Sequence, residues 1–315
     1  MNQALQLLDR RFPDPKVRAF AIMSLRAISD RDLSRYLLQL CQQLKFEPYH
    51  DSALARFLLD RALTNKNVIG HGLFWFLRSE MHVADARTRF GAVLQLYIRY
   101  CSDHRLQIGQ QVFVMRNLEQ AAKAVKICET KEERKACLQQ HLLAMVFPAQ
   151  FQLPIGDKTT YAGVFVPKCR IMSSKKKPLW LHFWRSDRKC ITPSPSRISG
   201  LSFNTMDSAR DQKTDDEQFE ELYEDDDYEI LMFKAGDDLR QDQMTLQMLR
   251  MMDKIWTTPP HNLDLRMNPY GCCATGKDLG MIEVVTNSAT TAHIQVRNSR
   301  CALMCDDEFD GFSCL

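Results

Sequence analysis

The residues best suited to chemistry in this sequence follow a short apolar segment. Leu231–Phe233 predict a buried strand, and Lys234 comes directly after them. Beyond Gly236, Asp238 and Asp242 stand four residues apart, so on a helix they share one face. A lysine held between a sheet and an acidic helix face is the arrangement with which kinases grip a nucleotide phosphate. Spacing alone favours the alternative of a structural ion pair, because ion pairs are common and phosphate sites are rare.

A strand, a turn and a helix must position these groups. Gly236 ends the apolar run, and Asp237 and Asp238 suit a helix start, where acidic side chains cap free N–H groups. The helix is expected over Asp238–Trp256, packed on the sheet. Its expected apolar stripe comprises Thr245, Met248, Leu249, Met252, Ile255 and Trp256.

Further strands are predicted around a basic turn. The strand-like segments are Tyr161–Val166, Cys169–Met172 and Leu179–Trp184. In the Ser-Ser-Lys-Lys-Lys turn between the last two, Ser173 or Ser174 and Lys175 or Lys176 would hold phosphate together with backbone N–H groups. The alternative is a basic turn that is simply solvated.

Residues 1–154 predict helix after helix. A segment capped by Asp30 or Ser29 is followed by helices from about 51, around 70–82, and over 84–101, 108–128 and 131–145. The expected inward-facing residues of the first three are Leu33, Leu37, Leu40, Cys41, Leu44, Leu54, Phe57, Leu58, Ala62, Phe74, Leu77 and Met81. Such helices joined by short loops predict a helical-repeat stack. His71, among apolar neighbours, is interpreted as a packing residue with a hydrogen-bonded ring.

Composition excludes several classes of function. The 315 residues suffice for two domains, and a net charge of +3 argues for no particular partner, so no nucleic acid is expected. The N-terminus lacks a signal-peptide pattern, and no apolar run approaches the length of a membrane span. The 11 cysteines form no C-x-x-C pair, which suits reduced thiols in a cytosolic protein and predicts no metal site.

Three long motifs resemble the phosphoinositide 3-kinase family. The first is FKxGDDLRQDxxTLQMLRxMDxIW, which begins at Phe233. MSSKKKPLW, at Met172–Trp180, is similar to the family's phosphate loop. LDLRMNPYGCCATG, at Leu263–Gly276, and MIEVV, at Met281–Val285, are similar to its deep pocket and hinge. The PYGC form is most similar to class I members.

The resemblance implies a multi-domain fold. An α-helical repeat domain of armadillo or HEAT type is expected over 1–154, because FPDPKVRAFAI, LLQLCQQLKFEP and GHGLFWFLRSEMH also resemble the family. A kinase-like N-terminal lobe, with an antiparallel sheet and one long helix, is expected over 155–297. A Ser-, Pro- and acid-rich insertion at about 185–229 is expected to be disordered. Residues 298–315 are expected to form an unrelated tail.

The resemblance also implies an ATP site. Ser174 and Lys175 match phosphate contacts, and Lys234 would hold the α-phosphate with help from the helix, where Asp242 is favoured over Asp238. The adenine would bind the Glu283 carbonyl and the Val285 N–H, above Ile282. The full set for ATP is Met172, Ser174, Lys175, Trp180, Met232, Lys234, Asp242, Tyr270, Ile282, Glu283 and Val285.

The resemblance ends near the C-terminus. The family continues into a larger lobe with a catalytic Asp-Arg-His stretch and a metal-binding Asp-Phe-Gly, and Mg²⁺ is expected only with that lobe. DEFDGF, near the C-terminus, is no substitute, because no catalytic loop precedes it. We therefore expect a partial chain with no catalytic residue of its own and no activity alone.

For the parent protein, the resemblance implies transfer of the ATP γ-phosphate to the 3-hydroxyl of phosphoinositides. It implies a cytoplasmic protein recruited to the plasma membrane, with a regulatory subunit and a small GTPase as partners through regions largely outside this chain. Three alternatives remain open: a related Ser/Thr kinase, a non-enzymatic interaction protein with a vestigial lobe, and a misassembled gene product. PYGC and the helical-domain match argue against the first.

Overall fold

The computed structural model describes residues 2–155, 159–186, 228–286, 288–289 and 294–295. By its internal contacts the chain divides into one unit over Met1–Glu283 and a second over Val284–Leu315. The predicted insertion at 185–229 lies outside the described residues except for its flanks, where Arg185, Tyr228 and Glu229 are strand residues. The predicted tail, 298–315, lies outside them too. The domain boundaries drawn from the sequence stay predictions.

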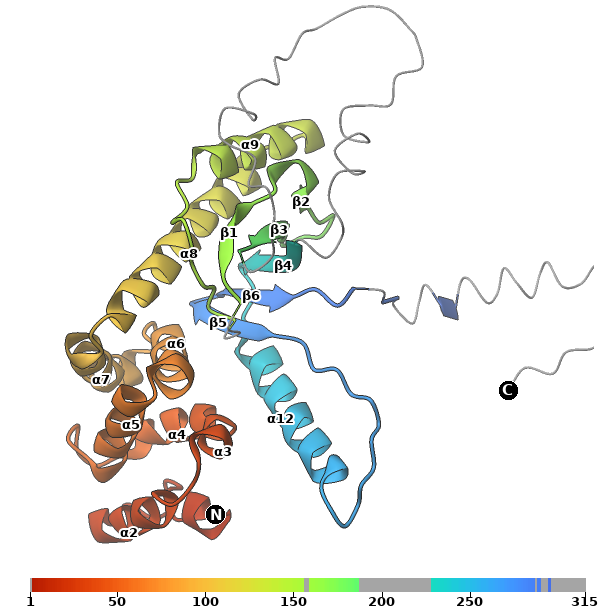
Figure 1. Cartoon of the computed structure of the whole chain (residues 1–315). Coiled ribbons are helices and arrows are strands. Elements are labelled where there is room, and N and C mark those ends of the chain that lie inside the picture. The colour runs from red at the N-terminus through yellow and green to blue at the C-terminus, as the bar shows by residue number, and fades with distance from the viewer. Residues whose placement is uncertain (1, 156–158, 187–227, 287, 290–293, 296–315) are drawn as a thin grey trace, which may run out of the picture. The chain divides into compact units, whose positions relative to one another are not determined.

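The N-terminal half is helical, as predicted (Figure 1). Its helices are α1 (Asn2–Gln6), α2 (Pro15–Leu25), α3 (Asp30–Ser34), α4 (Leu37–Gln43), α5 (Ala53–Thr64), α6 (His71–Ser79), α7 (Ala84–Tyr100), α8 (His104–Ile127) and α9 (Lys131–Ala144). A 3₁₀ turn, η1 (Leu44–Phe46), and a π-turn, η2 (Lys66–Gly70), lie between them. Helical structure is confirmed, whereas the armadillo or HEAT type stays a prediction.

Local signals positioned these helices well. Ser29 and Ser52 cap α3 and α5 by accepting hydrogen bonds from backbone N–H groups. The predicted inward-facing residues are buried, and Met81 is half-buried. The single helix expected from residue 30 is instead two helices, because the backbone of Tyr36 leaves helical values at φ −111° and ψ 0°.

An antiparallel sheet of six strands follows. Its strands are β1 (Tyr161–Val164), β2 (Arg170–Ile171), β3 (Leu179–Arg185), β4 (Tyr228–Ala235), β5 (Cys272–Gly276) and β6 (Leu279–Glu283), with a 3₁₀ turn, η3 (Val166–Lys168), after β1. The order is β1-β3-β4-β6-β5, and β2 pairs with β3. This agrees with the expected kinase-like lobe, although sequence reasoning did not identify β5 as a strand.

The two faces of the sheet differ in burial. Leu181, Phe183, Leu231, Phe233 and Met281 are buried on one face and join the helical residues in one continuous hydrophobic core. Their neighbours along the strands point to the opposite face, because side chains alternate along a strand. That face is half-buried at Trp180, Met232 and Ile282, which leaves this part of it accessible to a ligand, whereas His182 and Trp184 on the same face are buried.

Helix α12 (Arg240–Thr257) packs differently from the prediction. It buries Gln243 and Leu246, and the Gln243 side chain accepts a hydrogen bond of 2.8 Å from the Ala274 N–H of β5. The predicted stripe faces outward instead, since Met248, Met252 and Ile255 are 41%, 42% and 58% exposed.

Polar contacts with the helical part fix this orientation of α12. The Gln247 amide donates to Gln39, at 2.6 Å, and Lys254 pairs with Asp32, also at 2.6 Å. In Figure 1, α12 accordingly runs from the sheet alongside α3 and α4. The predicted burial of the methionine-rich stripe was therefore wrong, because contacts with distant segments decided which face of the helix turned inward.

Candidate nucleotide-binding site

Lys234 lies next to the end of β4, and its ammonium pairs with Asp237. The Nζ–Oδ2 distance is 3.1 Å, and the two side chains are 23% and 40% exposed. Gly236 makes this pair possible, because its φ of +88° turns the chain back in a region that favours glycine. An ion pair this exposed contributes only about 0–1 kcal/mol to stability.

The expected partners of Lys234 were Asp242 or Asp238, and the structure corrects this. Asp238 instead accepts three hydrogen bonds from the Arg240 side chain and one, of 3.1 Å, from its backbone N–H. The helix therefore begins at Arg240, and Asp238 caps it from outside. Asp242 lies on the first turn of α12 and is exposed. The helix-face argument failed because the first acidic residues belong to a turn.

Cys272 lies close to both Asp242 and Lys234. Burial, aided by the Asp242 charge and opposed by the Lys234 charge, raises the pKa of this thiol to about 12. Asp242 therefore shares the surroundings of Lys234 without the predicted direct ion pair. Sequence reasoning rejected Cys272 as a metal ligand and otherwise used it only as part of the PYGC stretch.

A row of apolar side chains crosses the half-buried face of the sheet. Trp180 on β3 pairs with Met232 on β4, which in turn pairs with Ile282 on β6, and all three are half-buried. Lys234 is two residues beyond Met232, so it projects from the same face. The structure thus brings together four residues predicted for ATP.

The predicted hairpin turn is present between β2 and β3. Backbone hydrogen bonds close it, including Met172 N–H to the Pro178 carbonyl, at 3.0 Å, and Lys177 N–H to the Ser174 carbonyl, also at 3.0 Å. Ser174 and Lys175 are exposed, and their phosphate contacts stay a prediction.

Lys176 was left open as an alternative to Lys175 for holding phosphate, whereas Arg170 was not among the residues predicted for ATP. The Lys176 ammonium donates a hydrogen bond to the Gly236 carbonyl, beside the Lys234–Asp237 pair. The Arg170 guanidinium lies 4.7 Å from the centroid of the Trp180 ring. Arg170 and Trp180 are directly paired across strands β2 and β3. Both strands were predicted from the sequence, but their register was not.

Glu283 organises the segment predicted as the hinge. Its N–H donates to the Gly271 carbonyl, at 2.9 Å, and its carboxylate accepts from the Gly271 N–H, at 2.6 Å. The neighbouring Tyr270 is half-buried, and its carbonyl accepts a hydrogen bond of 2.6 Å from Arg250. Val285 belongs to the second unit and is 39% exposed. The adenine contacts of Glu283 and Val285 stay predictions.

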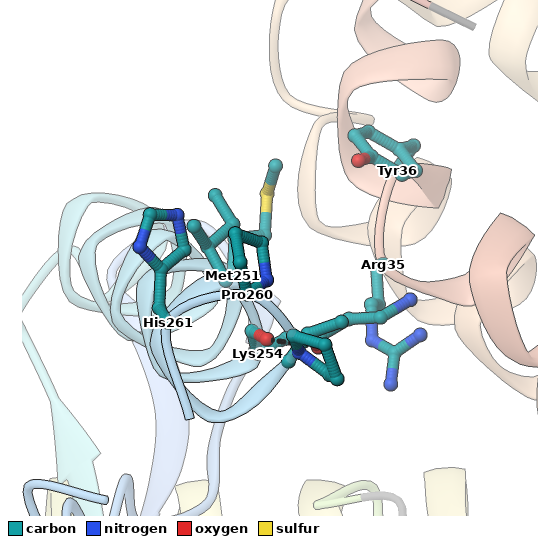
Figure 2. A pocket seen from close by; sticks show the side chains of 9 residues that line it. Arg35, Tyr36, Met251, Lys254, Pro260 and His261 are labelled. Atoms are coloured by element: carbon teal, nitrogen blue, oxygen red, sulfur yellow. Dashed lines mark hydrogen bonds between the residues drawn. The ribbon is translucent and has the colours of Figure 1, made fainter. Parts of the chain in front are cut away.

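A separate pocket of about 310 Å³ lies near the other end of α12 (Figure 2). Its lining residues are Arg35, Tyr36, Met251, Lys254, Ile255, Thr258, Pro259, Pro260 and His261. Arg35 and Lys254 both contact the same oxygen of Asp32, at 2.5 and 2.6 Å. Their charges are therefore already shared with a carboxylate, and the pocket adds nothing to the nucleotide site.

Two further properties concern the described residues only. Within the described ranges, no three His, Cys, Asp or Glu side chains gather in a way that could hold a metal ion. None of the helices in that part of the chain is both long and apolar enough to cross a membrane.

Helices joined to an antiparallel sheet, with a lysine at a strand end and an acidic turn before a long helix, define the class of a kinase N-terminal lobe with a helical accessory domain. Residues 1–110 match the model of the phosphoinositide 3-kinase family accessory domain (PIK domain), and residues 230–310 match that of phosphatidylinositol 3- and 4-kinase. The chain is therefore related to the phosphoinositide 3-kinase family in both of its parts, as its motifs predict.

Two relatives from Dictyostelium discoideum agree with this assignment. Phosphatidylinositol 3-kinase 2 is 41% identical over 292 residues, which cover 93% of this chain and 14% of the relative. Phosphatidylinositol 3-kinase 1 is 39% identical over 293 residues, which cover 93% of this chain and 16% of the relative. The chain thus spans a small part of the length of these relatives.

Proposed function

We propose that this chain provides the helical domain and the nucleotide-binding lobe of a class I phosphatidylinositol 3-kinase. The observation that carries the proposal is the position of the Lys234 ammonium beside the half-buried row of Trp180, Met232 and Ile282. An apolar face suits a flat adenine ring, and an ammonium supplies a point charge for a phosphate.

The Lys234–Asp237 pair supports a role in phosphate binding. Because both side chains are partly exposed, the pair is weak, and a phosphate oxygen can replace the Asp237 carboxylate at little cost. Lys176 stands at the same turn and adds a second positive charge. Ser174 and Lys175 complete the proposed phosphate contacts, while Met172 and Tyr270 complete the proposed pocket.

The proposal for the whole protein is transfer of the ATP γ-phosphate to the 3-hydroxyl of a phosphoinositide. The names of the two relatives support the reaction, and the PYGC stretch favours class I. Bound Mg²⁺ would supply positive charge across the phosphates, and its ligands are expected on the larger lobe. A regulatory subunit, a small GTPase and the membrane surface are proposed partners, and we propose a cytoplasmic protein recruited to the plasma membrane.

Titration with a fluorescent ATP analogue tests the proposal. We expect weak binding by the 315-residue chain, which Lys234→Ala abolishes. Lys123→Ala is the matched control, because Lys123 lies on α8 in an exposed ion pair with Glu119. Micromolar affinity that survives Lys234→Ala would contradict the assignment of Lys234.

A further inference from the structure

Two charged residues of the helical part reach the turn that carries the Lys234–Asp237 pair. Lys126, at the end of α8, donates a hydrogen bond of 2.5 Å to the carbonyl of Ala235, the residue that follows Lys234. Glu80, at the end of α6, forms an ion pair with Arg240, the first residue of α12, at an N–O distance of 3.2 Å. Arg240 also pairs with Asp238, at 2.7 Å. The helical part therefore contacts the chain directly just before Gly236 and, through Arg240 at the start of α12, just after Asp237.

The Lys126 contact depends on the shape of the turn. A Cβ atom at Gly236 would lie 3.1 Å from the Lys126 ammonium, so the glycine leaves the space through which the lysine approaches. The Gly236 carbonyl accepts from Lys176, and the Gly236 N–H donates to the Asp278 carbonyl, at 2.7 Å. The adjacent carbonyls of Ala235 and Gly236 are thus each bound by a lysine ammonium.

The Glu80 contact is part of a polar cluster whose central carboxylate is buried, while Lys45 and Arg240 stay partly exposed. Its carboxylate is buried at the end of α6 and also accepts from Lys45, at 3.0 Å, and from Gln42, at 3.2 Å. Hydrogen bonds between charged groups are stronger than neutral ones, and burial keeps solvent from replacing them. Arg240 therefore holds Asp238 against an anchor that belongs to the helical part.

We propose that Lys126 and, through Arg240, Glu80 are positioning residues for the nucleotide site. They fix the turn Ala235–Asp238 and thereby the position of the Lys234 ammonium. At that position a phosphate replaces Asp237 as the partner of Lys234. The helical part is then a component of the nucleotide site as well as a scaffold beside it. This inference rests on the proposed nucleotide function, but the anchoring of the turn can be measured without nucleotide.

The test combines backbone hydrogen exchange of the turn with titration of a fluorescent ATP analogue. In Lys126→Met, which keeps the length of the side chain and removes the donor, we expect exchange of the Gly236 amide to become roughly tenfold faster. We also expect the analogue to bind several-fold more weakly, with an unchanged unfolding midpoint. Lys126→Arg should restore both values, whereas Lys123→Met, on an exposed side chain of the same helix, should change neither.

Glu80→Gln provides an independent variant, because the glutamine side chain keeps one oxygen acceptor but lacks the negative charge of the carboxylate. It should also speed exchange in the turn. Unchanged exchange and unchanged affinity in Lys126→Met would overturn the inference, even if Glu80→Gln failed to fold. If the unsubstituted chain binds no analogue while Lys126→Met still exchanges faster, the anchoring of the turn stands and the proposed nucleotide function fails.

Discussion

The Lys234 ammonium lies 3.1 Å from the Asp237 carboxylate, three residues further along the chain. The pair brackets Gly236, whose positive φ reverses the chain between them. In the proposed site the carboxylate occupies the position of a phosphate oxygen, which would make Asp237 a competitor of nucleotide for the ammonium.

We predict that Asp237→Asn preserves or tightens nucleotide binding, by up to about fivefold, because an exposed pair is worth at most about 1 kcal/mol. Titration with a fluorescent ATP analogue measures the change, and Lys234→Met should show the opposite effect. A loss of affinity above about fivefold in Asp237→Asn would show that the carboxylate supports nucleotide binding.

Gly236→Ala should destabilise the chain by about 1–2 kcal/mol. The substitution places a side chain where φ is +88° and puts a Cβ 3.1 Å from the Lys126 ammonium. Gly109→Ala, inside α8 with nothing within 4 Å of the added methyl group, should instead stabilise by about 0.5–1 kcal/mol. Urea unfolding of both variants checks the two signs, and an equal effect at both glycines would refute this account of the turn.

The buried ion pair of Arg18 with Glu47 should matter more than any surface pair. Its N–O distance is 2.7 Å, the side chains are 1% and 3% exposed, and Arg18 also donates to the carbonyls of Leu8 and Phe12. Glu47→Ala leaves a buried charge without its partner and should cost about 3–5 kcal/mol in urea unfolding. Arg56→Ala removes an exposed pair with Asp51, and a comparable loss there would contradict the role of burial.

Acid should weaken the helical part through His104. Burial lowers the pKa of this ring to about 4, aided by the positive charges of His71 and Lys66. Above the ordinary pKa of 6.5, both folded and unfolded rings are neutral and the stability is fully present. As pH falls from 6.5 toward 4, only the unfolded ring takes up a proton, so up to about 3 kcal/mol is lost.

Urea midpoints at pH 7.5 and pH 5 measure this loss. His104→Asn keeps an acceptor for the Tyr97 hydroxyl, which lies 2.6 Å from Nδ1, and should show a smaller decrease over the same interval. Equal decreases in both proteins would assign the pH dependence to other groups.

Lipid phosphorylation by the 315-residue chain alone is predicted to be undetectable. Phosphoryl transfer in kinases requires a lysine and metal-binding groups together. No stretch of this sequence resembles the family's catalytic Asp-Arg-His or metal-binding Asp-Phe-Gly motif. The assay uses labelled ATP and vesicles that contain phosphatidylinositol 4,5-bisphosphate. Turnover that disappears in Lys234→Met would contradict the prediction, because it would show that this chain contains the catalytic residues.

Predictions from the sequence were correct where the structure depends on residues close together in the chain. The stripe of Leu33, Leu37 and Leu40 is buried as its spacing predicted, and Ser29 caps the helix that it precedes. Each of these features depends only on residues close in sequence.

Distant contacts account for the failures. Gln247 binds Gln39, 208 residues away, and such contacts turned the methionine stripe of α12 outward. Lys126 meets Ala235 across 109 residues, which leaves no local signal. The partner of Lys234 was mistaken because the helix was assumed to begin before Arg240.

The most direct test of the central claim is chemical labelling of the lysine that faces the phosphates. An acyl-phosphate derivative of ATP transfers its acyl group to a neighbouring amine, and mass spectrometry of peptides then locates the amide formed. We predict labelling of Lys234, with Lys176 as a secondary site, and suppression of both by excess ATP. Labelling at Lys234 that excess ATP leaves unchanged, or labelling suppressed by ATP only at other lysines, would contradict the account.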